Sequence, residues 1–397
     1  MAIAPTYVTA FTLTSALGVG NAATLDSIRN KASGLREHSM GDLGRTWFGF
    51  VDSQALRPIN GELAAYDNDC TRIVQTALEQ DGFTEAVERA KSRYGKNRIG
   101  CFLGTITSGI HVIEELYRDH EVALDRPPPL NLKCAYSVSL DAIMQYVRRK
   151  LDFTGPYATI GTACSSSAKV FATAHRYLQM GFCDAAIVAG VEGYSETLIN
   201  GFRSLGVLST EPCRPWDSAR DGISIGAAAG FALLEREPLQ DDALALVGYG
   251  ETADGHDMTA PHPEGKGIET AMLHALERAG LDAKDIDYIN AHGSATPMND
   301  MAEDAAVHRI FGDRVPVSST KGLTGHTQGA AGITEAIILM LGMQNDLVPG
   351  IHNTREIADG LKCNVSLDNQ TRRIRYGLTN SMGFGGNNAV LIFGRLN

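Results

Sequence analysis

The chain has 397 residues, 44% of them hydrophobic, so it is long enough to bury a large core in two or three domains. Its 35 basic and 46 acidic residues give a formal net charge of −11, which argues against nucleic acid or an anionic membrane surface as a partner. Seven cysteines without a C-x-x-C pair favour free thiols in a reducing compartment over a disulfide framework or a zinc ribbon. No basic residue precedes Arg29 and no apolar run reaches about 20 residues, so we expect a cytoplasmic protein with neither a signal peptide nor a transmembrane helix.

Apolar runs typical of strands alternate with helical periodicity along the chain, which predicts an α/β fold with largely parallel sheets. The pattern restarts near residue 237 and then follows a similar order, so we expect two related halves, 1–237 and 238–397. Residues 34–62 show no regular pattern and are expected to be irregular. The expected strands are 7–13, 98–105, 157–160, 184–190, 226–234, 243–250, 286–291, 315–318, 374–380 and 388–394. The expected helices are 70–78, 84–93, 111–118, 140–147, 168–180, 268–279, 300–311 and 328–341.

A glycine-rich segment, Gly18-Val-Gly-Asn-Ala-Ala23, follows the first strand and opens a helix. Its spacing fits the G-x-G-x-x-A pattern of dinucleotide-binding loops. Two glycines after a short strand are common, however, and the geometry of a turn explains them equally well. We therefore expect no cofactor there.

Cys164 follows the strand 157–160 and stands where a helix is expected to begin. Only small residues surround it, so a substrate could reach the sulfur. The partial positive charge of a helix N-terminus would favour the thiolate, the form that acts as a nucleophile. The competing interpretation is an inert, buried cysteine that packs as a small hydrophobe. The strand–turn–helix context alone leaves both interpretations open.

Three loops of the second half, each at the end of a strand, concentrate chemically active residues. The first carries His292, and the second carries Lys321 and His326 with Glu335 in the following helix. The third, residues 380–388, is a glycine-rich turn whose backbone could approach a ligand closely. Open α/β sheets place their ligand sites at such strand ends. A metal site made by the cysteine and the two histidines is disfavoured because the ligands are not clustered in the sequence.

Five segments together resemble the β-ketoacyl–acyl carrier protein synthases, the elongating condensing enzymes of the thiolase superfamily. They occur in the order found in that family, and the resemblance covers essentially the whole chain. The segments are Thr162-Ala-Cys-Ser-Ser166, Arg214-Pro-Trp-Asp-Ser-Ala-Arg-Asp-Gly222, Asn290-Ala-His-Gly-Ser-Ala-Thr-Pro297, Lys321-Gly-Leu-Thr-Gly-His326 and Asn380-Ser-Met-Gly-Phe-Gly-Gly-Asn-Asn388. The resemblance implies a thiolase fold, a duplicated five-layer αβαβα architecture with mainly parallel mixed sheets.

The resemblance also implies how the substrate is held. Cys164 would take an acyl group from the phosphopantetheine thioester of a carrier protein, and the backbone N–H groups of Cys164 and Phe384 would form the oxyanion hole. Ser294 and Thr296 would hold the pantetheine arm, and Phe384 would be an aromatic gate above the nucleophile. Met382 stands where that family commonly has an aromatic residue, and methionine is adaptable, so we expect the gate region to accept a different acyl chain.

For the decarboxylation of a malonyl–carrier protein, the resemblance implies that neutral Nε–H groups of His292 and His326 stabilise the developing enolate. Lys321 and Glu335 would support the second histidine and the charge balance of the pocket. No bound cofactor and no metal ion are implied, because the substrates are carried on the carrier protein.

The expected partners are acyl carrier protein and a second subunit, either identical or a homologous ketosynthase-like chain, without nucleic acid or membrane. The serine run 165–167 and the short N-terminal half are similar to ketosynthases of specialised pathways, the aryl-polyene type among them. The alternative is a non-catalytic partner subunit like a chain-length factor, although such subunits typically lose the cysteine or a histidine. A thiolase would need a second cysteine near the last glycine turn, and an initiating synthase would have asparagine rather than histidine at position 326.

Overall fold

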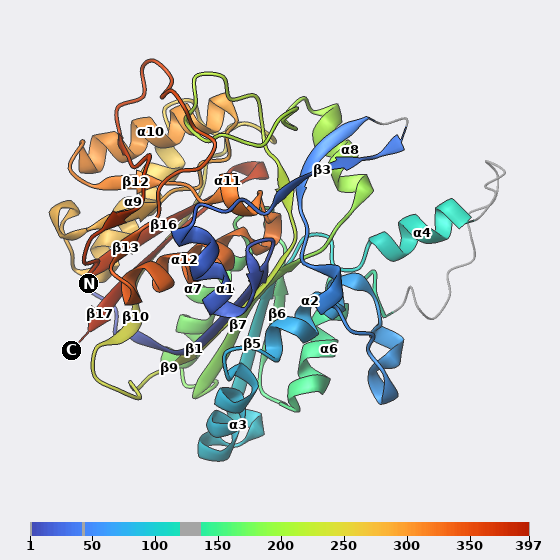
Figure 1. Ribbon diagram of the computed structural model, residues 1–397. Helices are drawn as coiled ribbons and strands as arrows, with labels where there is room; N and C mark the ends of the chain where they lie inside the picture. The colour runs from blue at the N-terminus through green and yellow to red at the C-terminus, as the bar shows by residue number, and fades with distance from the viewer. Residues whose placement is uncertain (1, 42–43, 120–135, 397) are drawn as a thin grey trace.

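The computed structural model describes residues 2–41, 44–119 and 136–396 (Figure 1). The strands are β1 Thr6–Ser15, β2 Gly18–Val19, β3 Leu35–Ser39, β4 Arg45–Gly49, β5 Ile99–Gly104, β6 Tyr157–Ile160, β7 Ala185–Glu192, β8 Ile225–Gly226, β9 Ala228–Glu235, β10 Ala243–Ala253, β11 Tyr288–Asn290, β12 Pro316–Ser318, β13 Leu347–Val348, β14 Asn364–Val365, β15 Gln370–Thr371, β16 Tyr376–Gly383 and β17 Asn387–Leu396. The α-helices are α1 Gly20–Arg29, α2 Asp69–Leu78, α3 Phe83–Tyr94, α4 His111–Asp119, α6 Ala142–Leu151, α7 Ser166–Gln179, α8 Glu196–Ser204, α9 Lys266–Ala279, α10 Pro297–Phe311, α11 Lys321–Thr324 and α12 Ala331–Gln344.

The main sheet repeats one pairing scheme twice. In the first half β5 pairs in parallel with β6 and β7, and antiparallel pairs then join β7 to β9 and β9 to β1. In the second half β11 pairs in parallel with β12 and β16, and antiparallel pairs join β16 to β17 and β17 to β10. The two series meet where β1 pairs with β10. The expected α/β fold with a mixed sheet is therefore confirmed, and its parallel pairs lie towards the two edges while the strands from β16 to β7 pair antiparallel. The division between residues 237 and 238 stays a prediction.

Alternate residues of the strands face different layers of helices, as the period of two in a strand requires. In β7, Val188 packs on the central helices α7 and α12, whereas Ile187 faces the outer helices α2, α3 and α6. In β17, Phe393 faces the central helices and Ile392 faces α9 and α10. Helices and sheet halves therefore form five layers, with α7 and α12 in the middle.

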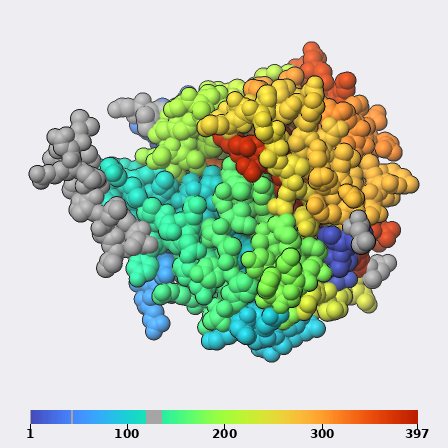
Figure 2. Space-filling view, turned by 180° about the vertical axis from the view of Figure 1, so that it is seen from behind, coloured from blue at the N-terminus to red at the C-terminus, as the bar shows by residue number. Residues whose placement is uncertain are grey.

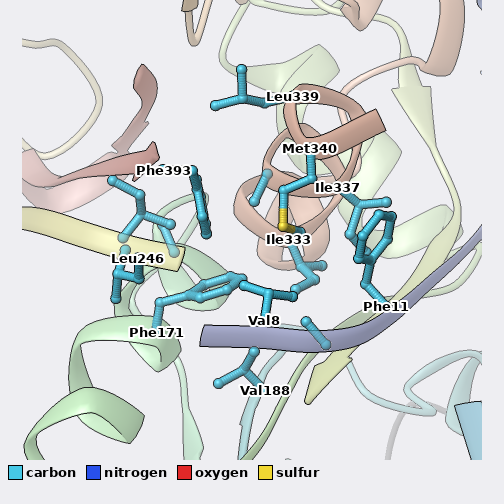
Figure 3. Packing of buried hydrophobic residues seen from close by; sticks show 14 of the residues in the cluster. Val8, Phe11, Phe171, Val188, Leu246, Ile333, Ile337, Leu339, Met340 and Phe393 are labelled. Atoms are coloured by element: carbon cyan, nitrogen blue, oxygen red, sulfur yellow. The ribbon is translucent and has the colours of Figure 1, made fainter. Parts of the chain in front are cut away.

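Helix α12 of the central layer is buried on all sides. Every residue of α12 from Ala331 to Met343 is buried, as expected for a helix without a polar face. Figure 3 shows Ile333, Ile337 and Met340 of this helix turned towards β1 and towards the aromatic rings of the neighbouring elements. The two central helices therefore have a fixed position in the core, and each begins next to one of the loops that carry the candidate site.

Two glycines let the start of α7 approach its neighbours closely. A Cβ atom at Gly104 of β5 would lie 2.4 Å from the backbone nitrogen of Ser167. A Cβ atom at Gly332 of α12 would lie 2.4 Å from the backbone nitrogen of Ala168. Since no side chain fits there, the first turn of α7 lies directly against both elements. This contact also fixes the position of Cys164, two residues before the helix.

The expectation that residues 34–62 are irregular was wrong in part. Strands β3 and β4 pair antiparallel, and β4 pairs in parallel with β8. Most of β3 is exposed, so it lacks the apolar alternation by which a strand is found in a sequence. Helix α8 also had no predicted counterpart. In the part of the chain that the structure describes, no helix is long and apolar enough to span a membrane.

Candidate active site

Cys164 lies at a tight turn between β6 and α7. Ala163 has a φ of 51°, a left-handed conformation that is strained for a residue with a side chain. The hydroxyl of Ser166 accepts the N–H of Thr162 at 2.8 Å and donates to the carbonyl of Ala163 at 2.6 Å. The hydroxyl of Ser165 donates to the carbonyl of Thr162 at 2.8 Å. These serines therefore hold the turn itself rather than capping the helix, as their position would also have allowed.

The environment of the sulfur favours the thiol over the thiolate, contrary to expectation. Burial raises the pKa of Cys164 to about 12, which outweighs the opposing effect of the positive charge on Lys321. The negative charge of Glu335 raises this pKa further, whereas the backbone N–H of Phe384, which faces the sulfur, lowers it. Only 7% of Cys164 is exposed, so little solvent remains to stabilise a thiolate.

The two histidines lie next to each other, with ring centroids 5.0 Å apart and an angle of 78° between the rings. Nδ1 of His326 accepts the backbone N–H of Gln328 at 3.1 Å, and Nδ1 of His292 lies 3.3 Å from Nζ of Lys321, a donor. The second nitrogen, Nε2, of each ring therefore carries the hydrogen. Burial, and then the charge of Lys321, holds the pKa of both histidines well below its ordinary value. Two neutral Nε2–H donors result.

Lys321 and Glu335 form an ion pair inside the protein, with side chains only 2% and 3% exposed. Burial raises the pKa of Glu335 to about 7, against the effect of Lys321. The lysine also donates to the backbone carbonyl of His292. The expectation that it supports the second histidine is thus corrected, because Lys321 follows β12, which pairs directly with the strand that leads to His292. On His326 it acts only through its charge.

Ser294 and Thr296 lie together, with their hydroxyl oxygens 2.9 Å apart. Both line a cavity of about 320 Å³ that also borders Cys164, the two histidines and Met382. In Figure 2 the surface is hollowed between the segments near residues 200 and 260, and atoms of the red C-terminal segment lie inside the hollow. The residues expected to touch one substrate therefore share one cavity.

A second cavity, of about 350 Å³, leads away from Cys164 towards α8. Cys164 borders both cavities, together with Phe202, Leu205 and Phe384. The rings of Phe202 and Phe384 are in edge-to-face contact, with centroids 5.8 Å apart. These apolar side chains therefore separate the two cavities at the sulfur atom, and a long ligand bound to it could extend into the second one.

Family descriptions and individual relatives place the chain in the same protein family. The family description "Beta-ketoacyl synthase, N-terminal domain" matches residues 69–239, and "Beta-ketoacyl synthase, C-terminal domain" matches residues 244–355. A 3-oxoacyl-[acyl-carrier-protein] synthase 2 of Staphylococcus aureus is 35% identical over 363 residues, 84% of this chain and 89% of the relative. The chain belongs to the β-ketoacyl synthase family. A 3-oxoacyl-[acyl-carrier-protein] synthase 1 of Haemophilus influenzae is 32% identical over 427 aligned positions, 99% of each chain.

Solved structures of the β-ketoacyl synthase family show the same fold. A complex of the ketosynthase ApeO with its chain length factor ApeC, from Xenorhabdus doucetiae, matches with a TM-score of 0.89 and 35% identity over 98% of each chain. The ishigamide ketosynthase/chain length factor matches with a TM-score of 0.87 at 24% identity over the whole of both chains, a likeness of fold. The expected thiolase-type architecture is thus confirmed.

In this β-ketoacyl synthase, two buried acids near the site were not singled out from the sequence. Glu303 of α10 accepts the backbone N–H groups of His292 at 2.7 Å and Gly293 at 2.8 Å, and the side chain of Asn380 at 2.9 Å. Asp300, one turn earlier, accepts the backbone N–H of Trp216 at 2.9 Å. Two acids three residues apart lie on one face of a helix, and this spacing directly after the histidine loop was the available signal.

Replacing Lys321 with methionine is expected to lower the thermal stability of this β-ketoacyl synthase, because it leaves the buried carboxylate of Glu335 without its partner. Loss of one member of a buried pair commonly costs about 3–5 kcal/mol. An acid whose pKa is raised by folding stabilises the protein at low pH and loses this contribution as the pH rises. The loss of melting temperature should therefore be larger at pH 8 than at about pH 5.5, as scanning calorimetry would show.

Replacing Lys284 with methionine provides the control, because its ion pair with Asp282 is exposed. This variant should unfold close to the parent protein at both pH values. An equal loss for Lys321→Met at the two pH values would contradict the ionised state inferred for Glu335.

Proposed function

We propose that this chain is a β-ketoacyl–acyl carrier protein synthase that acts in fatty-acid, aryl-polyene or polyketide synthesis. The observation that carries the proposal is the position of two neutral Nε2–H donors and one cysteine around a single cavity, with a second cavity behind the cysteine. The names of the relatives, 3-oxoacyl-[acyl-carrier-protein] synthases, support the same chemistry.

In the first step Cys164 takes the acyl group. The sulfur gives up its proton and attacks the thioester carbon of an acyl–carrier protein, the bond to the pantetheine sulfur breaks, and the free carrier thiol takes up the proton. The backbone N–H groups of Cys164 and Phe384 stabilise the oxygen of the tetrahedral intermediate. Because burial raises the pKa of Cys164 to about 12, the resting cysteine is a thiol and must lose its proton as it attacks. The acyl chain then occupies the cavity beside α8.

In the second step a malonyl–carrier protein enters the first cavity, where Ser294 and Thr296 hold its pantetheine arm. The bond to the carboxylate breaks and releases carbon dioxide, and its electron pair forms an enolate. The Nε2–H groups of His292 and His326 donate hydrogen bonds to the enolate oxygen. These hydrogen bonds become stronger as negative charge develops on the oxygen. The enolate carbon attacks the thioester on Cys164, the carbon–sulfur bond breaks, and a β-ketoacyl–carrier protein leaves.

We also propose that the protein pairs with a second subunit along β6. This strand forms one edge of the main sheet, and Tyr157 at its start is 41% exposed. An unpaired edge strand offers its backbone groups to another chain. Structures related to this one contain a ketosynthase with its chain length factor, which supports a homologous partner subunit, and one contains an acyl-carrier protein in complex with its ketosynthase.

The test is intact-protein mass spectrometry after incubation with a panel of acyl–carrier proteins, followed by malonyl–carrier protein. The expected result is a mass gain of one acyl group, absent in Cys164→Ala, and then discharge of the group as an extended β-keto product. If no member of the panel acylates the protein alone or together with candidate partner subunits, the function proposed here is wrong and a non-catalytic partner subunit takes its place.

A further inference from the structure

The second cavity has two walls that lie far apart in the sequence. Ile106, Thr107 and Ile110, in the loop between β5 and α4, line one wall, and residues of α8 and its N-cap Ser195 line the other. The space between the walls therefore depends on the contacts that hold the loop and α8 relative to each other.

Glu114 of α4 connects the two walls. Its carboxylate accepts the hydroxyl of Ser195 at 2.7 Å and the backbone N–H groups of Thr197 at 2.9 Å and Glu196 at 3.1 Å. These N–H groups belong to the first turn of α8, which has no acceptor within its own helix. Burial opposes ionisation, but the hydrogen bonds from Ser195 and Thr197 outweigh it and lower the pKa of Glu114. An ionised carboxylate on α4 thus holds the N-terminus of α8.

Glu192, at the end of β7, anchors the first wall to the sheet. It accepts the hydroxyl of Thr105 at 2.8 Å and the backbone N–H of Thr107 at 3.4 Å, and it also accepts the N–H of Ile106 and the hydroxyl of Thr107. A Cβ atom at Gly329 would lie 2.6 Å from Oε1 of this carboxylate, so the protein leaves it little room to move. The cavity-lining residues Ile106 and Thr107 are therefore fixed by one buried acid.

We propose that Glu114 and Glu192 are positioning residues that set the width of the cavity behind Cys164 and thereby select the acyl chains that the protein accepts. The inference rests on the proposed function, in which this cavity receives the acyl group. Neither carboxylate lines the first cavity, where the malonyl group would bind. Acyl-chain selection and decarboxylation should therefore respond differently when these acids are changed.

The test compares Glu114→Gln with the parent protein, since glutamine keeps the size of the side chain but cannot accept from all three donors. Transfer to Cys164 is measured for a series of saturated acyl–carrier proteins of increasing length. We expect the ratio of kcat/KM between long and short chains to change by about tenfold, the scale on which one methylene group is discriminated. Malonyl decarboxylation should stay within about twofold of the parent value. Glu115→Gln, an exposed neighbour on the same helix, is the matched control.

Thr107→Val provides the second variant, because it removes one hydrogen bond of Glu192 to the wall and leaves the shape of the residue. It carries the test should Glu114→Gln not fold. The proposal is overturned if the folded variants show the same dependence of kcat/KM on acyl-chain length as the parent protein. It is also overturned if acyl transfer falls equally at all chain lengths and decarboxylation falls with it. A parent protein that no carrier thioester acylates would instead refute the proposed function. In that case the width of the cavity is tested with N-alkyl iodoacetamides of increasing tail length, and the rate at which each modifies Cys164 is measured. If the variants and the parent protein show the same dependence of this rate on tail length, the proposal is again overturned.

Discussion

Cys164→Ala is expected to abolish acyl transfer and condensation while malonyl decarboxylation continues or rises. The variant lacks the sulfur atom that lies at the junction of the two cavities and is proposed to form the covalent thioester. Loss of a covalent nucleophile commonly lowers kcat by more than about 10⁴-fold. The two histidines do not depend on the sulfur for their tautomers, because their Nδ1 atoms face Gln328 and Lys321. Decarboxylation is measured as release of labelled carbon dioxide, and condensation as the β-ketoacyl product.

Cys183→Ala is the control for this experiment, since Cys183 is buried in the core and lines neither cavity. It should retain both reactions. Elongation by Cys164→Ala at the parent rate would remove this cysteine from its proposed role.

His326→Ala is expected to reduce decarboxylation about 10²–10³-fold, the usual cost of one donor to a developing oxyanion. Self-acylation should fall less, because its oxyanion hole consists of backbone N–H groups. The pKa of His326 lies well below its ordinary value, so the donor is present throughout the neutral range. The decarboxylation rate of the parent protein should accordingly show no loss from protonation of this ring between about pH 6 and pH 8.

His274→Ala, on the outer helix α9, serves as the control and should leave both half-reactions unchanged. Stopped assays of carbon dioxide release and of acyl-enzyme formation separate the two steps. Equal loss of both in His326→Ala would contradict the division of labour between the histidines and the backbone donors.

The sequence predicts the central strands and the helix after Cys164 well, because buried elements carry strong apolar patterns. It also identifies Cys164, His292 and His326, which border the first cavity, since each follows a strand end. The residues of α8 that line the cavities were not predicted. Strand β3 escapes prediction because most of its residues are exposed and it is held by pairing with β4 rather than by an apolar face. Edge strand β6 is less buried than its apolar residues suggest.

The hydrogen-bond partners and pKa values of buried groups are harder to predict from the sequence than the positions of strands and helices. Glu114, Glu192 and Glu303 look like residues of solvated helix faces or strand ends, yet each binds backbone N–H groups that lie from 10 to 86 residues away. The pKa of Cys164 is likewise set by burial, which depends on the whole packing around it. From the sequence, the start of a helix next to Cys164 can be predicted, and with it the electrostatic effect of the helix N-terminus. How far the fold buries the sulfur cannot be predicted in the same way.

The repeated strand order explains how two different sets of chemical groups came to surround one cavity. Loops after the corresponding strands β6 and β12 carry Cys164 and His326. Of the corresponding strands β7 and β16, the first ends with Glu192 and the second is followed by Phe384. Corresponding loops of the two repeats thus carry residues with different proposed roles, the nucleophile Cys164 in one and the hydrogen-bond donor His326 in the other. The two series of strands meet at the pair β1 and β10, and each series brings its own residues to the site. The chemical groups of the site are therefore different on its two sides, although the strand order on both sides is the same.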